Sequence, residues 1–585
     1  CSDDNRGLTP PARQDGDPRD AFLRDYQDKT EPTRRILDHL LHQTFAGQAE
    51  QSEPESDLLL DTQPDPETIR AVLGRYPFRD VQGAYQNLVQ LAQESVPFLS
   101  TRRCRHFLAS IAPALLRAVA DTPDPDMALV NLEKVTNSLG AKTVLWELFS
   151  FNPPSLKLYV DLCAWSQFLS EILINNPGMI DELLDSLVLN QPRSGEELRG
   201  ELADLCRGAA DLEPILHSFQ DKELLRIGVR DILHKDSIQE TTAVLSDLAE
   251  VLLEQIASRQ YAPLMKRYGV PILSEGEHAG QPSRFAILAL GKLGGREMNY
   301  HSDLDLMMVY EGDGRTEPRP GSSRFDNYDL TDNYHFFTEV AQHIIKATSY
   351  LGPMGRLYAI DMRLRPTGKS GSLVTPLCEF RRYFVTQQDS TSHPEGGAQL
   401  WERQALTRAR IVHGDAAFGQ EVMDAVAEGA YGLPWRPEIV AEIQAMRERL
   451  QASRPASNLK RGPGGLADVE FLVQLLQIKY GRDRLVLRQP NTWQALHALR
   501  DAGLLSAEEQ TALTAAYDFL LRVQNRLRIV QNRSIDELPE TVEEIDKLAR
   551  RLGYETGERF LAVLEQHRTR TRELFLCLLE REGRD

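Results

Sequence analysis

The sequence contains few cysteines, and their spacing argues against two kinds of site. Only six cysteines occur in 585 residues, and none belongs to a CxxC pair or stands near a histidine at metal-ligand spacing. The pattern therefore favours neither a zinc-thiolate centre nor a disulfide framework. We expect reduced thiols, and hence a cytoplasmic protein.

Long apolar runs are also missing. No stretch approaches the roughly 20 apolar residues that a membrane-spanning helix needs, so we expect no membrane association. The first residues, CSDDNRGLTPPARQDGDPRD, are too polar for a signal peptide. Because residues 1–34 are charged and rich in proline, we expect them to form a disordered or flexible tail.

An excess of positive charge is the third absence. The chain has 67 lysines and arginines against 86 aspartates and glutamates, a formal net charge of -19. Binding to nucleic acid depends on basic surface that neutralises phosphates, so a nucleic-acid partner is not expected. The length suffices for several domains with an ample core, and an acidic enzyme is the better class.

The most informative segment is residues 285–306, FAILALGKLGGREMNYHSDLDL, an apolar run followed by a glycine turn and an SDLDL sequence. Alternate residues of a strand share a face, so Asp303 and Asp305 are expected side by side. Two close carboxylates repel each other, and a divalent cation is the natural compensation. Gly294, Gly295 and Ser302 are predicted to hold phosphate oxygens. The alternative is a solvated strand end.

A third carboxylate follows at a suitable distance. Residues 334–350 have the apolar spacing of a helix, and residues 356–366, RLYAIDMRLRP, alternate like a strand. This strand would bring Asp361 to Asp303 and Asp305. Three carboxylates on neighbouring strands suit two Mg²⁺ ions, and Mn²⁺ is the alternative ion. Two such ions together promote phosphoryl displacement.

Several basic residues near these segments are candidates for binding a nucleotide, and each has a structural alternative. Arg363 is expected to contact either triphosphate or Asp361. Lys369 lies in a loop beside the nucleotide or in a solvated turn. Arg408 and Arg410 reach phosphate or form ion pairs within the protein. Lys460 lies in a glycine-rich turn before a helix, where an anion is favoured.

Hydrophobic patterning divides the remaining chain. Residues 35–261 are mostly helical, with breaks at 51–66, 121–126, 152–154 and 190–194. Residues 262–415 form a mixed α/β unit, which we expect to be the catalytic domain, and residues 416–585 form a C-terminal helical bundle. In this bundle Ser506 and Glu509 have the spacing of a capping box, and Gly553 suits a helix end.

Four ordered motifs carry a resemblance to a known family: GKLGGREMNYHSDLDL at 291–306, DMRLRPTGKSGSLVT at 361–375, WERQALTRARIVHGD at 401–415 and KRGPGGLADVEF at 460–471. The chain resembles the nucleotidyltransferase superfamily with a DNA polymerase β-type core, and within it the glutamine synthetase adenylyltransferase family. The resemblance implies an α+β fold, with a polymerase β-like core embedded between mostly α-helical bundle domains. It also implies ATP as substrate and catalysis by Asp303, Asp305 and Asp361.

Members of this family typically have two similar halves, one attaching AMP to a tyrosine of glutamine synthetase and the other removing it with phosphate. This chain has one GG…SDxD signature and begins with Cys1, as expected of one half of such an enzyme. Residues 158–184 resemble the helices that introduce the adenylylating half. The resemblance therefore favours adenylylation, with glutamine synthetase and the PII signalling protein as partners. Phosphorolytic removal of AMP, and a non-catalytic docking fragment, are the alternatives.

Overall fold

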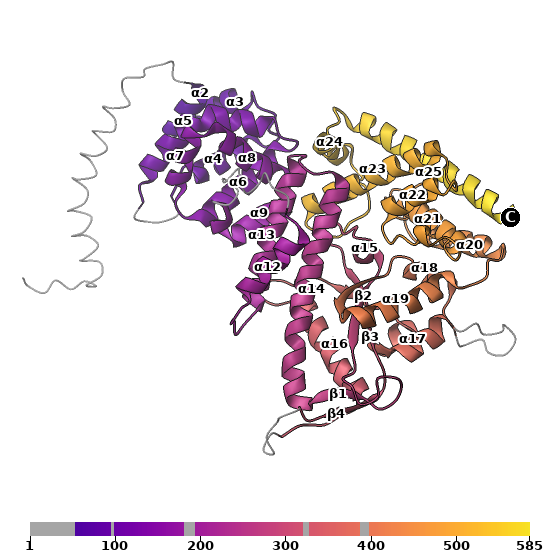
Figure 1. Ribbon diagram of the computed structural model, residues 1–585. Helices are drawn as coiled ribbons and strands as arrows, with labels where there is room; N and C mark the ends of the chain where they lie inside the picture. The colour runs from indigo at the N-terminus through magenta and orange to yellow at the C-terminus, as the bar shows by residue number, and fades with distance from the viewer. Residues whose placement is uncertain (1–52, 95–98, 181–192, 320–326, 386–396, 585) are drawn as a thin grey trace, which may run out of the picture.

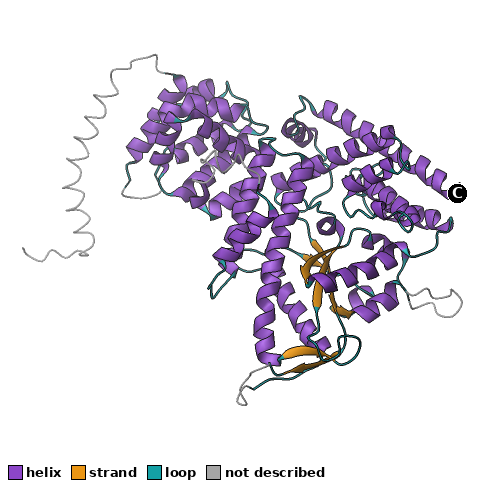
Figure 2. Ribbon diagram, viewed as in Figure 1, coloured by secondary structure: helices purple, strands orange, loops and turns teal. Residues whose placement is uncertain are grey.

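The computed structural model describes residues 53–94, 99–180, 193–319, 327–385 and 397–584. Helices surround a small mixed sheet near the middle of the molecule (Figure 1, Figure 2). The predicted α+β class is thus confirmed. The flexible tail expected at 1–34 lies outside the described residues. None of the described helices combines the length and apolar character that crossing a membrane requires.

The N-terminal part is helical, as predicted. Its helices are α2 (Pro54–Leu60), α3 (Pro66–Leu73), α4 (Val81–Leu91), α5 (Thr101–Ala120), α6 (Pro125–Leu139), α7 (Lys142–Phe151), α8 (Pro153–Trp165), α9 (Gln167–Asn175), α12 (Gly195–Leu205), α13 (Glu213–Ile232) and α14 (Ile238–Tyr268), with a 3-10 turn η1 (Pro177–Met179). The breaks predicted at 121–126 and 152–154 fall at helix junctions.

The break predicted at 51–66 is wrong in part, because it contains helix α2. Pro54 begins this helix, where the missing N–H of proline costs nothing, and Leu58 and Leu59 are buried. Helix α14 continues through residue 262, so the boundary expected between 261 and 262 lies inside a helix.

The central sheet has five strands: β2 (Phe285–Ala289), β3 (Leu304–Tyr310), β5 (Ile360–Asp361), β6 (Val374–Pro376) and β7 (Arg410–Gly414). Strands follow the order β5-β3-β2-β7, and β6 also pairs with β3. The pairs β2–β3 and β2–β7 are antiparallel, whereas β5 and β6 run parallel to β3. Strands β1 (Val270–Leu273) and β4 (Gly314–Glu317) form a separate antiparallel pair.

The strand predicted over 356–366 is much shorter than expected. Only Ile360 and Asp361 pair with β3. Beyond them the chain turns, because the N–H of Arg365 donates to Met362 O and the N–H of Gly368 donates to Arg365 O. This turn leads into the 3-10 segment η2 (Gly368–Ser370).

Strand β2 is buried along its whole length because helices cover both faces of the sheet. On one face Phe285 and Ile287 join the core that the sheet shares with the N-terminal helices and with α16 (Asn333–Ser349), the helix predicted at 334–350. On the other face Ala286 and Leu288 pack in a second core with α17 (Leu377–Phe384), α18 (Leu400–Leu406) and α19 (Ala416–Tyr431).

The C-terminal helices form a third core. They are α20 (Glu438–Ala452), α21 (Leu466–Tyr480), α22 (Thr492–Asp501), α23 (Ala507–Gln531), α24 (Val542–Arg551) and α25 (Gly557–Arg584), with a 3-10 turn η3 (Leu485–Leu487). The capping box of Ser506 and Glu509 is confirmed at the start of α23. Gly553 adopts a φ of 83° between α24 and α25, as its predicted role requires. Helix α23 contacts both α9 and α14, so the C-terminal helices lie against the rest of the molecule (Figure 1).

Candidate active site

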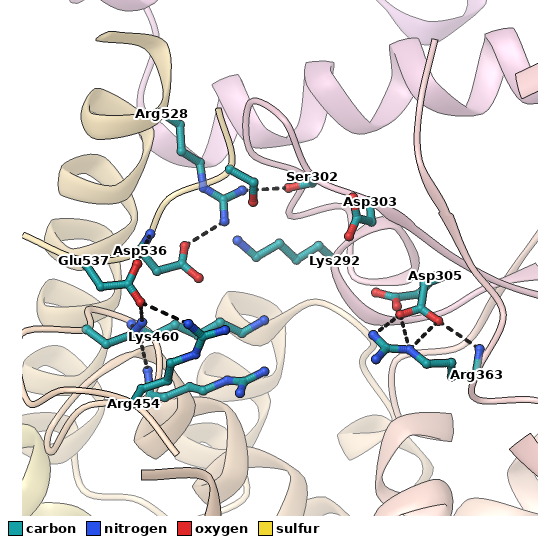
Figure 3. Close-up of a pocket in the computed structure, with 14 residues that line it drawn as sticks. Lys292, Ser302, Asp303, Asp305, Arg363, Arg454, Lys460, Arg528, Asp536 and Glu537 are labelled. Carbon is teal, nitrogen blue, oxygen red and sulfur yellow. Dashed lines mark hydrogen bonds and ion pairs between the residues drawn. The ribbon is translucent and has the colours of Figure 1, made fainter. Parts of the chain in front are cut away.

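The three carboxylates singled out from the sequence lie together at one end of the sheet. Asp303 directly precedes β3, Asp305 is its second residue, and Asp361 ends β5. The parallel register places Asp305 opposite Asp361. All three line one cavity of about 390 Å³ (Figure 3).

A short glycine-led turn makes room for Asp305. The N–H of Leu290 donates to the carbonyl oxygen of Asp305 at 2.8 Å, which holds the end of β2 against β3. Gly291 begins the one-turn helix α15 (Gly291–Gly294) with a φ of 53°, a region that favours glycine. A Cβ on Gly291 would overlap Oδ2 of Asp305 and lie 2.9 Å from its Cγ. Glycine is therefore required here for Asp305 to keep its position.

The charge of Asp305 is incompletely balanced. Burial raises the pKa of Asp305 to about 6; Lys460 counteracts this rise, and the neighbouring carboxylates of Asp361 and Asp303 add to it. A buried carboxylate beside two others gains from a nearby cation. The end of the sheet is therefore electrostatically suited to a divalent ion.

The opposite wall of the cavity comes mainly from loops between the C-terminal helices, and it carries Arg454, Lys460 and Arg461 together with the acids Asp536 and Glu537. Figure 3 shows Lys460 and Arg454 on one side, Asp303 and Asp305 on the other, and Lys292 between them. The basic residues that line the cavity are Lys292, Arg363, Arg454, Lys460, Arg461 and Arg528. Such a wall suits a polyanionic ligand held beside the carboxylates.

Lys292 and Arg528 were not predicted as site residues. The Nζ of Lys292 donates to Gln524 Oε1 at 2.9 Å, and Arg528 donates to Asp536 Oδ1 at 2.7 Å and to Ser302 Oγ at 3.4 Å. Lys292 lies inside the glycine-rich motif, which was a usable signal. Arg528 lies on α23 and reaches the site only through tertiary packing.

The carboxylates fit magnesium in donor type and strand position but do not converge on one point. Hard oxygen ligands are what Mg²⁺ prefers. In the described ranges, however, no three or more His, Cys, Asp or Glu side chains are close enough together to hold a metal ion. Asp361 instead accepts hydrogen bonds from the Arg363 Nε at 2.7 and 2.9 Å. The Arg363 side chain that makes this contact is 66% exposed.

Of the predicted nucleotide-binding residues, Ser302, Arg363 and Lys460 line the cavity. Arg363 contacts Asp361 in the structure, which was one of the two alternatives predicted for it. The side chain of Lys369 lies outside what the structure describes.

Gly294 and Gly295 do not line the cavity; they are buried against Arg408. Their N–H groups donate to Leu290 O and Gly291 O within the turn of α15. A Cβ on Gly294 would overlap the carbonyl oxygen of Arg408 and lie 2.7 Å from that of Ala289. The structure therefore gives this glycine pair a packing role, and their predicted contact with phosphate finds no support in the cavity.

Arg408 and Arg410 likewise form ion pairs outside the cavity. Buried Arg408 pairs with Glu297 and, at 3.3 Å, with Glu470. Arg410 pairs with Glu250 of α14 at 2.6 Å and also donates to the carbonyl oxygens of Leu293 and Gly294. The structure thus shows these two arginines in ion pairs within the protein, which was one of the two predicted alternatives.

Two family models match parts of the chain. Residues 156–425 match a family model described as glutamate-ammonia ligase adenylyltransferase, and residues 438–579 match one described as GlnD PII-uridylyltransferase.

Two relatives, from Thioalkalivibrio sulfidiphilus (strain HL-EbGR7) and Nitrosococcus oceani (strain ATCC 19707 / BCRC 17464 / JCM 30415 / NCIMB 11848 / C-107), are each named bifunctional glutamine synthetase adenylyltransferase/adenylyl-removing enzyme. The first is 33% identical over 491 residues, covering 82% of this chain and 49% of the relative. The second is 32% identical over 474 residues, covering 78% and 47%. The chain thus spans about half the length of these curated relatives.

Proposed function

Because the chain belongs to the glutamate-ammonia ligase (glutamine synthetase) adenylyltransferase family, we propose that it transfers AMP from ATP to a tyrosine hydroxyl of glutamine synthetase and releases pyrophosphate. The observation that carries this proposal is the register of Asp305 opposite Asp361, beside Asp303, facing a cavity lined by cations. The function implies a cytoplasmic location, where ATP and the synthetase are available.

The cations of the cavity would bind the triphosphate. Lys460 faces the carboxylates across the cavity, Lys292 lies between them, and Arg528 lies beside Ser302. Arg363 would exchange its contact with Asp361 for one with a phosphate oxygen, since its guanidinium is mostly exposed. Holding the reacting groups in this way supplies much of the rate of a phosphoryl transfer.

The carboxylates would hold two Mg²⁺ ions. Asp303 and Asp305 would contact both ions and Asp361 one of them, once Arg363 has moved. When bound, the ions would neutralise the triphosphate and lower the cost of forming a phenolate, whose ordinary pKa is about 10.

The transfer itself is a displacement at the α-phosphorus. The tyrosine oxygen forms a bond to the α-phosphorus, the bond from that phosphorus to the oxygen bridging to the β-phosphorus breaks, and pyrophosphate leaves with the bonding electrons. Asp361 would accept the phenolic proton. Asp303 and Asp305 position the centre at which these bonds change.

Phosphorolytic removal of AMP is the second candidate, because the names of the relatives include an adenylyl-removing activity and the chain spans only half of each. The same carboxylates would serve both directions. A docking fragment without catalysis is less favoured, because the three carboxylates and the cationic wall are all in place. The match of residues 438–579 is the observation that favours a PII protein as a regulatory partner.

The deciding experiment incubates the purified chain with glutamine synthetase, Mg²⁺ and α-labelled ATP, and follows the synthetase by intact mass. We expect label on the synthetase with the wild-type chain and none with Asp305→Asn. Phosphate-dependent release of ADP from pre-modified synthetase, without labelling, would assign the removing activity instead. If the chain shows neither activity, the proposal is contradicted.

A further inference from the structure

A second and larger cavity meets the cationic one at Ser302 and Asp303. It has a volume of about 910 Å³ and shares Ser302, Asp303 and Ser534 with the first cavity. We call it the acceptor groove. Residues 298–303 and residues 353–359 line it.

Two helices form its other walls. Helix α9 presents Phe168, Glu171, Ile172 and Asn175, which share one face because they are three or four residues apart. Helix α13 presents a corresponding face that includes His217, Asp221 and Leu224. Helix α13 lies beside α14, and α9 contacts α13 (Figure 1). Helices outside the sheet thus form part of the groove. The groove nevertheless reaches Asp303, one of the three carboxylates.

The charge of the groove differs from that of the cationic cavity. Besides Asp303, its acids are Glu171 and Asp221, and its arginines are Arg356 and Arg533. Because its acids outnumber its arginines, the groove has no preference for a triphosphate. Its lining also mixes apolar and polar side chains, as expected of a surface that recognises polypeptide.

An exposed apolar segment, which we call the lip, includes Met354, which lines the groove, and Tyr350 and Leu351, which precede it in the chain. Gly352 and Gly355 pair as an isolated bridge, which makes residues 352–355 a tight hairpin with Met354 at its tip. Tyr350, Leu351 and Met354 are 59%, 72% and 48% exposed. Large apolar side chains grouped on a surface mark a contact with another protein, and binding a nucleotide would not require them.

Nε2 of His301 is one of the buried polar atoms of the groove that lack a partner among the described residues. His301 has a left-handed backbone with a φ of 55°, and its ring packs edge-on against Phe168 at 4.7 Å between centroids. Its Nε2 is buried without a hydrogen bond to any described residue. Buried polar atoms normally have a partner, so a ligand in the groove is expected to provide one.

We infer that the acceptor groove holds the segment of the protein substrate that carries the acceptor hydroxyl, with an apolar side chain of that segment against Leu351 and Met354. The inference rests on the proposed function. The triphosphate would occupy the cationic cavity and the acceptor segment the groove, so that the two substrates meet at Asp303 from different sides.

The test compares two sets of exposed substitutions. Leu351→Glu combined with Met354→Glu changes the lip, and Phe151→Glu, at an 80% exposed position on α7, is the matched control. We expect the lip variant to raise the KM for glutamine synthetase about tenfold, with kcat and the Kd for ATP unchanged, because a few large side chains carry most of the affinity of an interface. The control should change none of these values. An unchanged KM, or weaker ATP binding instead, would overturn the inference.

A second measurement does not depend on catalysis. Met354→p-benzoylphenylalanine is irradiated with purified glutamine synthetase, and the cross-linked peptide is identified by mass spectrometry. We expect cross-links within a few residues of the acceptor tyrosine. Cross-links elsewhere or none would overturn the groove assignment, whereas cross-links at the tyrosine without any AMP transfer would sustain the groove and refute the proposed activity.

Discussion

Replacing Gly291 with alanine tests whether transfer activity depends on the position of Asp305, apart from any change in the stability of the fold. Two effects are expected. Alanine in the left-handed region, at the φ of 53° seen here, costs about 1 to 2 kcal/mol. The added Cβ would also overlap Oδ2 of Asp305 and lie 2.9 Å from its Cγ, so the carboxylate has to move by about 1 Å.

A matched variant isolates the second effect. Gly503 has a φ of 73° and no atom within 4 Å of an added Cβ, so Gly503→Ala carries the backbone cost alone. We expect both variants to lose similar stability in urea unfolding. Only Gly291→Ala should lose transfer activity, by about 100-fold, since a displacement of about 1 Å in a catalytic group has that effect.

The assay is the rate of AMP transfer to glutamine synthetase at saturating ATP, normalised to the folded fraction. Activity of Gly291→Ala close to that of Gly503→Ala would show that the position of Asp305 is not critical. Such a result would remove the main argument for its catalytic role.

Two further predictions concern charge. Burial is the main reason why the pKa of Asp305 is raised from 3.8 to about 6. The native state therefore binds this proton more tightly than the unfolded state does. As pH rises from about 4 to about 6 and above, ionisation of this carboxyl destabilises the fold by at most about 3 kcal/mol. In metal-free buffer, Asp305→Asn should raise Tm at about pH 8 and leave it nearly unchanged at about pH 4, and equal shifts at both would contradict the reasoning. Arg408→Met leaves Glu297 and Glu470 without their cation, so urea unfolding should show a loss of about 3 to 5 kcal/mol. The Kd for ATP of this variant should be unchanged, and weaker ATP binding at unchanged stability would restore Arg408 to the nucleotide site.

The carboxylates could be predicted because they obey a local rule. Alternation along a strand places Asp303 and Asp305 together, and the motif containing Asp361 follows the helix that was also predicted. The length of β5 could not be predicted in this way. The turn after Asp361 depends on backbone hydrogen bonds of Arg365 and Gly368 that alternation does not reveal.

The cationic wall was predicted only in part. Lys460 lies in a conspicuous glycine-rich turn, whereas Arg528 lies in a helix whose pattern indicates only burial. Its contact with Ser302 joins residues 226 positions apart. Arg408 shows the opposite case, because a basic residue in a recognisable motif proved to pair with buried acids. Neither outcome follows from spacing, since the first depends on how α23 packs beside Ser302 and the second on how Arg408 meets Glu297 and Glu470 of α21.

The division of the cavity between the sheet and the C-terminal helices limits how the chain can be shortened. A truncation after Tyr431 would retain every strand and all three carboxylates. It would nevertheless remove Lys460 and Arg528, and with them one wall of the cavity. Under the proposed function, the sheet and its flanking helices are therefore not a portable catalytic module, and a minimal enzyme has to extend through α23.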